Sequence, residues 1–253
     1  MSEMEQTSFP KVTDAIKDAV KHLAINKNFL LIFMAFSIIA ATIMYIGDPT
    51  AGQINFDEEI SLSNFSDQID SQEDAEVSIV YVLGNLFYFF GYAVLAGPMI
   101  LYSLSVAQKK AITTNELLKG IKFSLPIIGV TLLSLVLIGV GLLLLIVPGI
   151  ILALRLILPT FLIVDKKLGV IDSLKESFRI TKGYALSILA FTLLIGVIFF
   201  IPLLIIIIFA PAVSQVVSDL IGLVYSIAIA KVYYFLVHNN SSESAADSKL
   251  KTA

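Results

Sequence analysis

The hydrophobic residues of this chain are gathered into long runs that carry almost no charge. The hydrocarbon core of a bilayer takes about 20 helical residues, and the run at residues 28–47 matches that length. Longer runs follow at 77–108, at 123–164 with Arg155 as its single charge, and at 183–218, which continues beyond Asp219 to residue 237. This pattern predicts an all-α, polytopic membrane helix bundle.

Proline-containing turn signals divide the longest runs into pairs of spans. Pro148-Gly149 and Ala210-Pro211 each predict a tight turn between two membrane helices. Gly97-Pro98 falls inside a run that suits one long span, where the missing backbone donor of proline predicts an interruption or a kink. We therefore expect a membrane domain over residues 28–238, with spans at 28–47, 77–107, 125–147, 150–165, 184–209 and 213–237.

The basic residues lie on one side of these spans. They precede the first span, connect the second to the third and the fourth to the fifth, and follow the sixth. The alternate segments, 48–76, 148–149 and 210–213, contain no Lys or Arg. Because Lys and Arg in short loops stay in the cytoplasm, the sequence predicts six spans in the cytoplasmic (inner) membrane, with both termini in the cytoplasm.

A short, Lys-bearing amphipathic segment precedes each odd-numbered span. The three segments contain VTDAIKDAVKHLAINKNF, TTNELLKGIKF and GVIDSLKESFRITKG. In the last segment, Val170, Leu174 and Phe178 share one helical face, and Lys175 and Arg179 lie away from it. Such helices lie in the interface with their basic side toward anionic headgroups. We expect three helical hairpins, each preceded by a cytoplasmic amphipathic interfacial helix. This repetition reflects either a threefold duplication or the generic charged segments that separate the spans of many membrane proteins.

Composition supports this interpretation and excludes several classes of protein. Of 253 residues, 57% are hydrophobic and 15% are charged, and the mean hydropathy is +0.91. The net charge of −3 argues against nucleic-acid binding, which needs a basic face. The sequence contains no Cys, which excludes disulfides and thiolate metal sites. Residues 1–27 lack the apolar core of a signal peptide, so we expect a cytoplasmic N-terminal segment with an amphipathic helix. The polar residues 239–253 predict a disordered cytoplasmic tail.

One segment carries a family resemblance. PGIILALRLILPTFLIVDKKLGVIDSLKESFRITKG contains a Pro-Gly turn, an arginine-bearing span with a Pro-x-Phe-x-x-Val-Asp end, and a Leu-Lys-x-Ser-Phe-x-x-Thr-Lys-Gly helix. This order resembles the membrane domain of the glycerophosphoryl diester phosphodiesterase family and related uncharacterised bacterial inner-membrane proteins. The resemblance is best over residues 146–183 and weaker over 115–238.

The resemblance implies an integral membrane module of about six helices and does not extend to phosphodiesterase activity. In that family the chemistry belongs to a separate soluble barrel domain. Every stretch of this chain long enough to hold such a domain is occupied by expected spans.

Arg155 and Asp219 are the charged residues that fall within the outer halves of the expected spans. Counted from Pro148 and Pro211 at 1.5 Å per residue, they lie at similar depths near the outer surface. Intramembrane charges usually face the bundle interior or a water-filled cavity and pair with one another. We therefore expect an Arg155–Asp219 contact, as a structural ion pair or as part of a substrate or proton site. Alternatively, Asp219 lies among the headgroups.

Other polar patterns suggest packing. Small residues at four-residue spacing on the sixth span predict a helix-packing face, either within the monomer or in a homo-oligomer: Ser214, Ser218, Gly222, Ser226 and Ala230. Asn85 and Tyr88 belong to a polar stripe on the second span that lines a cavity or packs against neighbours. The loop at 48–76 holds nine acids and no basic residue. It lacks the order of a calcium loop and predicts a flexible, solvated segment.

The sequence shows no motif for catalysis, for a metal or for a cofactor, because it lacks HExxH, Walker and GxSxG patterns. We expect a non-enzymatic structural or accessory membrane module that binds anionic lipid headgroups of the inner leaflet. The alternative is a small transporter or lipid-handling protein with a site around Arg155, Asp219, Asn85 and Tyr88. The expected headgroup contacts are Lys17, Lys21, Lys119, Lys122, Lys175, Arg179 and Lys182.

Overall fold

The computed structural model describes residues 8–23, 27–47 and 78–251, and all regular structure in these ranges is helical. The acidic loop expected at 48–76 lies outside the described residues. The elements are α1 (Val12–His22), α2 (Lys27–Gly47), α4 (Ile79–Ala107), α5 (Thr114–Leu118), the 3-10 helix η2 (Lys119–Phe123), α6 (Ser124–Leu144), α7 (Ile146–Arg155), α8 (Pro159–Lys166), α9 (Val170–Ile180), α10 (Ala185–Phe209) and α11 (Pro211–Lys251).

The described chain provides six helical stretches that are long and apolar enough to cross a membrane, with α5, η2 and α6 forming the third and α7 and α8 the fourth. The prediction of an all-α protein with six spans is confirmed at this level. Length and composition of these helices indicate a multi-pass membrane protein.

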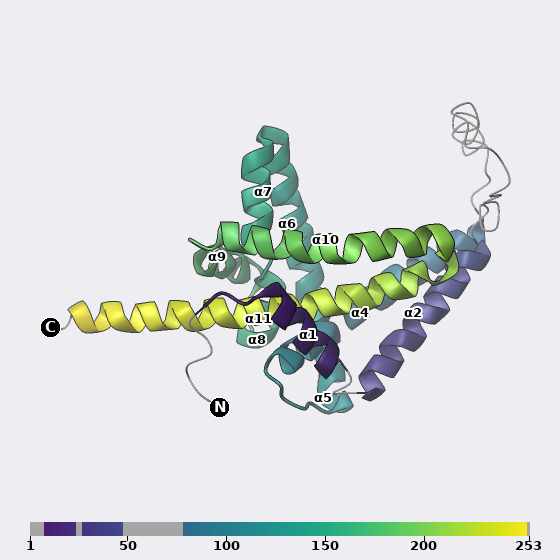
Figure 1. Cartoon of the computed structure of the whole chain (residues 1–253), viewed down its shortest axis with the longest axis horizontal. Helices are drawn as coiled ribbons and strands as arrows, with labels where there is room; N and C mark the ends of the chain where they lie inside the picture. The colour runs from purple at the N-terminus through teal and green to yellow at the C-terminus, as the bar shows by residue number, and fades with distance from the viewer. Residues whose placement is uncertain (1–7, 24–26, 48–77, 252–253) are drawn as a thin grey trace.

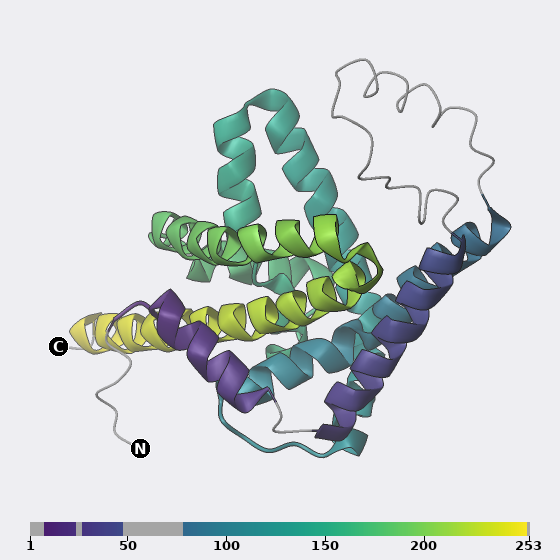
Figure 2. The ribbon, with the colours of Figure 1, turned by 45° about the vertical axis from the view of Figure 1, so that its right-hand side comes forward.

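α4 and α11 occupy the centre of the arrangement. α4 contacts α2, α6 and α8, and α11 contacts α1, α2, α4 and α10. Figure 1 shows α10 beside α11, with α6 and α7 rising away from both. In Figure 2, the pair of α2 and α4 extends in a direction different from that of the α10–α11 pair and of the α6–α7 pair. The pairs of helices therefore meet at one end and diverge toward the other.

The hydrophobic core lies where the helices meet. α2 buries Phe29 and Phe33 near its beginning, α10 buries Ile188 and Phe191 near its beginning, and α4 buries most of its last eleven residues, 97–107. We call this the basic end, because it carries three lysines: Lys109 just after α4, Lys166 at the end of α8, and Lys231 within α11. At the diverging end, large apolar side chains are exposed, among them Leu143, Val197 and Phe200. Lipid tails are the solvent that suits such a surface.

The turn between the third and fourth spans lies at Leu145, and not at Pro148-Gly149 as predicted. Leu145 is extended between α6 and α7. Pro148 lies in the first turn of α7. Backbone N–H groups in a first turn have no acceptor within the helix, so the N–H that proline lacks costs no hydrogen bond there. A Cβ atom on Gly149 would lie 2.6 Å from Leu142. The pair thus begins a helix and permits close packing on α6.

The fourth span, predicted as one helix over 150–165, is broken. α7 ends at Arg155, and α8 begins at Pro159. Proline lacks the N–H that would continue the helix, and its ring clashes with the preceding turn. The break leaves Arg155 at the C-terminal end of a helix, where the exposed carbonyl groups favour a cation.

α4 continues through Pro98 without interruption. Proline at this position leaves the carbonyl oxygen of Val94 without its usual donor four residues later. The Ser124 hydroxyl, at the beginning of α6, donates to that oxygen at 2.8 Å and accepts from the Gly97 N–H at 3.3 Å. A Cβ atom on Gly120 would lie 2.9 Å from the Pro98 nitrogen. The proline therefore marks a close contact between the second and third spans.

Short helices stand at the three positions where the amphipathic segments are expected. α1 buries Val12, Ala15 and Ala19 and contacts α11 and α4. α9 buries Leu174 and Ile180 and contacts α8 and α6. α5 begins with a capping box in which Thr113 and Glu116 bond each other's backbone N–H groups. α1 and α9 thus pack on the bundle through part of their apolar residues, while Val20 and Ile171 stay exposed.

α11 continues to Lys251, into the tail for which composition predicts disorder. Residues 238–251 contain no Gly or Pro, so nothing in the local sequence stops the helix after the sixth span.

Candidate functional site

The Asp219 carboxylate is buried among the spans and is held by three neutral donors. The Ser37 hydroxyl of α2 donates to Oδ2 at 2.5 Å. The Tyr88 hydroxyl of α4 donates to Oδ1 at 2.9 Å, and the Gln215 amide of α11 donates to the same oxygen at 3.2 Å. Asp219 is 8% exposed and Ser37 is 1% exposed. We call these four residues the Asp219 cluster.

The cluster lies at the middle of α2 and within the first third of α4. Ser37 is ten residues from each end of α2, which corresponds to about 15 Å in each direction. Tyr88 is nine residues from the beginning of α4, or about 14 Å. Asp219 is eight residues from Pro211, where α11 begins, or about 12 Å, and its contact with Ser37 sets it opposite the middle of α2.

Small and aromatic residues bring α2 and α4 together beside the cluster. A Cβ atom on Gly84 would lie 2.9 Å from Ile43, and one on Gly91 would overlap the Phe36 ring. The Phe36 ring stacks on Tyr88 with centroids 6.1 Å apart. This packing fixes the Tyr88 side chain, so that its hydroxyl reaches α11.

Basic residues do not neutralise Asp219. The ion pairs formed within the described ranges all lie at the basic end and leave Asp219 out. Lys231, twelve residues further along α11 and about 18 Å away along the axis, donates to Asp18 instead. In the part of the chain that the structure describes, no group of three or more His, Cys, Asp or Glu could hold a metal ion.

Arg155 lies elsewhere, and the predicted Arg155–Asp219 ion pair is absent from the described residues. The guanidinium carbon is 5.8 Å from the centroid of the Phe178 ring on α9. The Arg155 Nε atom is buried without a hydrogen-bond partner in the described structure. The Ser177 hydroxyl donates to the Arg155 carbonyl oxygen at 2.5 Å. The break after Arg155 thus places it against α9, whereas Asp219 faces α2 and α4.

The polar stripe of the second span is divided between two roles. Tyr88 belongs to the Asp219 cluster, as the transport alternative expects. Asn85 donates to the Tyr81 carbonyl oxygen at 2.8 Å within α4. Ser37 and Gln215 were not predicted as partners of Asp219. Gln215 could have been found from its position one turn before Asp219, but Ser37 could not be assigned without knowing that α2 packs on α11.

The small-residue face of α11 is packed against the bundle at its later residues, Ser226 and Ala230. The Ser103 hydroxyl of α4 donates to the Ser226 hydroxyl at 2.8 Å, and Ala230 is completely buried. A Cβ atom on Gly222 would meet nothing within 4 Å. Ser214 and Ser218 are half-buried. Packing within the monomer therefore accounts for Ser226 and Ala230, and self-association through the rest stays a prediction.

The seven expected headgroup contacts are all exposed side chains: Lys17 and Lys21 on α1, Lys119 and Lys122 on η2, Lys175 and Arg179 on α9, and Lys182 after α9. Arg179 also pairs with Glu176, to which its Nε donates at 2.7 Å. Lys122 lies over the Phe123 ring, 5.0 Å from the centroid.

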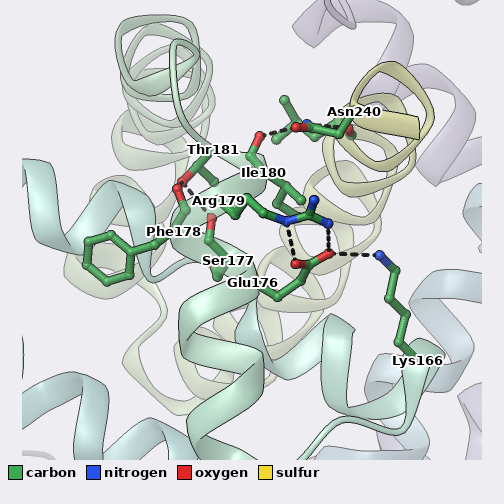
Figure 3. A network of polar contacts seen from close by, with 9 residues as sticks. Lys166, Glu176, Ser177, Phe178, Arg179, Ile180, Thr181 and Asn240 are labelled. Atoms are coloured by element: carbon green, nitrogen blue, oxygen red, sulfur yellow. Dashed lines mark hydrogen bonds and ion pairs between the residues drawn. The ribbon is translucent and has the colours of Figure 1, made fainter. Parts of the chain in front are cut away.

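Ion pairs attach α9 and α1 to the bundle at the basic end. Glu176 accepts from Arg179 and from Lys166 of α8, as Figure 3 shows. These two cations, Arg179 above all, lower the Glu176 pKa to about 2. Lys231 donates to Asp18 at 2.5 Å, and this bond is the main reason that the Asp18 pKa lies below its usual value. The sequence shows that Lys166, Arg179 and Lys231 belong to basic segments, but it does not identify Glu176 and Asp18 as their partners.

Comparisons of the chain with family models, with curated proteins and with solved structures give no match. The resemblance to the phosphodiesterase membrane domain therefore stays a prediction.

Proposed function

We propose that this protein is a non-enzymatic structural or accessory module of the cytoplasmic membrane, held against the anionic inner leaflet by basic side chains. In this proposal three helical hairpins, each with its preceding short helix, place α1, the α5–η2 segment and α9 at the cytoplasmic interface. Both termini lie in the cytoplasm. The observation that carries the proposal is that all seven basic side chains are exposed and lie on, or directly after, the short helices α1, η2 and α9.

The packing of the short helices supports this role. Because α1 buries Val12, Ala15 and Ala19 and α9 buries Leu174 and Ile180 against the bundle, their lysines and Arg179 are left exposed. Each Lys or Arg near an anionic surface contributes about 1 kcal/mol of attraction. Seven such groups would give a marked preference for anionic lipid over zwitterionic lipid.

The proposal is tested by the lipids that the full-length protein retains. The wild-type protein and a variant with all seven side chains changed to Gln would be extracted gently from the same membranes and analysed by native mass spectrometry. We expect the wild-type protein to retain anionic lipid above its share of the membrane and the variant to lose that enrichment. The matched control is Asp14→Asn with Asp172→Asn, which changes exposed charges on α1 and α9 of the opposite sign. Equal anionic enrichment in the wild-type protein and the seven-residue variant would refute the role of these side chains.

Transport is a second candidate function, because the buried Asp219 cluster joins three spans at the middle of α2. A transport pathway must bring water to this site from one side of the membrane. The absence of Cys from the sequence gives a clean background for labelling single Cys variants in native membranes. Gly222→Cys lies one turn from Asp219, and Gly196→Cys lies on α10; a Cβ atom at either position meets open space.

A membrane-impermeant thiol reagent distinguishes a water-filled path from a lipid-facing surface. Transport predicts labelling of Gly222→Cys and none of Gly196→Cys. Absence of labelling at both positions, with both labelled after denaturation, would count against a hydrated path to the site.

A further inference from the structure

We propose that Asp219 is a proton-binding site within the membrane, where it binds and releases a proton while Ser37, Tyr88 and Gln215 hold it in place. The inference rests on the second proposed function, in which the Asp219 cluster is part of a transport site. It does not depend on the lipid contacts of the basic end, which are tested by a different measurement.

The surroundings of Asp219 provide hydrogen bonds but no compensating charge. Three donors stabilise the carboxylate form, and bonds from neutral donors to a charged acceptor are among the stronger hydrogen bonds. The cost of keeping a charge in the membrane interior acts in the opposite direction and favours the neutral acid. Neither protonation state is locked by an ion pair in the described structure. This balance is what an exchangeable proton needs.

The titratable groups facing Asp219 are few. Tyr88 and Tyr92 of α4 lie close enough to interact with its charge. α2 presents only Ser37 at this depth, because its Lys27 and Tyr45 lie toward the two ends of the helix. α10 contains no titratable side chain, and the charged groups of α1 and α9 lie at the basic end, among them Asp18 and Arg179. Tyrosines keep their protons in the range where a carboxyl group ordinarily titrates, so Asp219 is the one group of the described cluster that can exchange a proton there.

Proton binding fits the geometry better than metal binding. Both carboxylate oxygens face donated hydrogens, two on Oδ1 and one on Oδ2, whereas a metal ion needs oxygen lone pairs directed at it. When the carboxylate takes up a proton from water, one oxygen becomes an O–H donor that needs an acceptor. The Ser37 oxygen, 2.5 Å away, can accept this bond while its own hydroxyl turns to a backbone carbonyl of α2. The exchange forms one O–H bond at Asp219 and removes one from the hydronium ion, so the net charge of the site changes from −1 to 0.

Infrared difference spectroscopy of the full-length protein in lipid nanodiscs tests the proposal. The carboxylic acid C=O band would be recorded between about pH 4 and pH 9, a range that covers carboxyl groups shifted by burial. Beside the band of the exposed acids, which titrate near pH 4, we expect an additional titrating band in the wild-type protein that is missing in Asp219→Asn. Asp165→Asn is the matched control, because Asp165 also accepts from a tyrosine of the bundle, Tyr233 at 2.5 Å, but lies at the basic end. The Asp165→Asn variant should keep the additional band.

Two conservative variants test the assignment without removing the carboxyl group. Ser37→Ala and Tyr88→Phe each delete a donor to the charged form, so each should move the midpoint of the additional band to higher pH, by about one unit. Bands that are the same in wild-type protein and Asp219→Asn would overturn the proposal. So would an additional band that responds to sodium at constant pH, because sodium and not a proton would then occupy the site.

Discussion

The Ser124 hydroxyl replaces the backbone donor that Pro98 lacks, and this role can be measured with a double-mutant cycle. Ser124 is buried, donates to the Val94 carbonyl at 2.8 Å and accepts from the Gly97 N–H at 3.3 Å. In Ser124→Ala the Val94 carbonyl is left buried without a partner, which costs about 1–3 kcal/mol. We therefore expect the free energy of unfolding to fall by that amount.

The second arm of the cycle is Pro98→Ala. Alanine at position 98 has an N–H that can donate to the Val94 carbonyl in the ordinary helical pattern. Ser124→Ala should consequently cost clearly less in the Pro98→Ala background, and the coupling energy between the two sites should be about 1–2 kcal/mol. Pro98→Ala has effects of its own on packing, but the cycle subtracts them.

Unfolding in mixed micelles with increasing SDS, followed by circular dichroism, provides the assay. Ser134→Ala is the control, since Ser134 is a buried serine on the same helix. It should show no coupling with Pro98→Ala. If Ser124→Ala costs the same with proline or alanine at position 98, the hydroxyl does not replace the missing donor and the explanation is wrong.

Three further predictions follow from the packing and charge of the basic end. Gly120→Ala should lower the unfolding temperature because its Cβ would lie 2.7 Å from Leu101 and 2.9 Å from the Pro98 nitrogen, whereas Gly139→Ala, which meets open space, should not. Asp18→Asn and Lys231→Gln should each speed hydrogen exchange of the α1 amides, because both break one bond of 2.5 Å. The double variant should be no faster than Asp18→Asn, which also removes the Asp18–Lys109 ion pair at 3.9 Å; Lys17→Gln is the control. Glu176 has a depressed pKa of about 2, so its stabilising contribution is complete above the ordinary value of 4.5 and is lost as the pH falls toward 2. Glu176→Gln should therefore make the unfolding temperature less dependent on pH in that window, and an unchanged pH profile would contradict the role of its ion pairs.

The spans could be predicted because their cause is local in the sequence. A run without charge of the length of a bilayer must be a helix that satisfies its own backbone, and α2 begins within one residue of its expected start. The turn at Ala210 was likewise predicted, since Pro211 begins the next helix there. Pro148 was misassigned because proline suits both a turn and the first turn of a helix, and the sequence alone does not distinguish the two.

The candidate site was harder to predict because it depends on which spans pack together. Asp219 and Arg155 are the conspicuous charges, and a pairing rule based on charge alone joins them. The structure instead gives Asp219 the hydroxyl groups of Ser37 and Tyr88, which are 182 and 131 residues away along the chain. Neither residue stands out in an apolar span, so the partners of a buried charge become visible only when the helix packing is known.

The Asp219 cluster joins the first two spans, α2 and α4, to the last span, α11. This contact has a consequence for the order in which the helices assemble. Ser37 and Tyr88 enter the membrane early in synthesis, but their acceptor belongs to α11, which is made last. Ala228 and Tyr233, both fully buried in the core, also belong to that helix. Until α11 arrives, the earlier spans can be inserted but cannot complete their packing. A chain truncated before residue 211 would therefore lack the acceptor of the Tyr88 hydroxyl, so the first two spans would hold a polar group whose partner is made only at the end of synthesis.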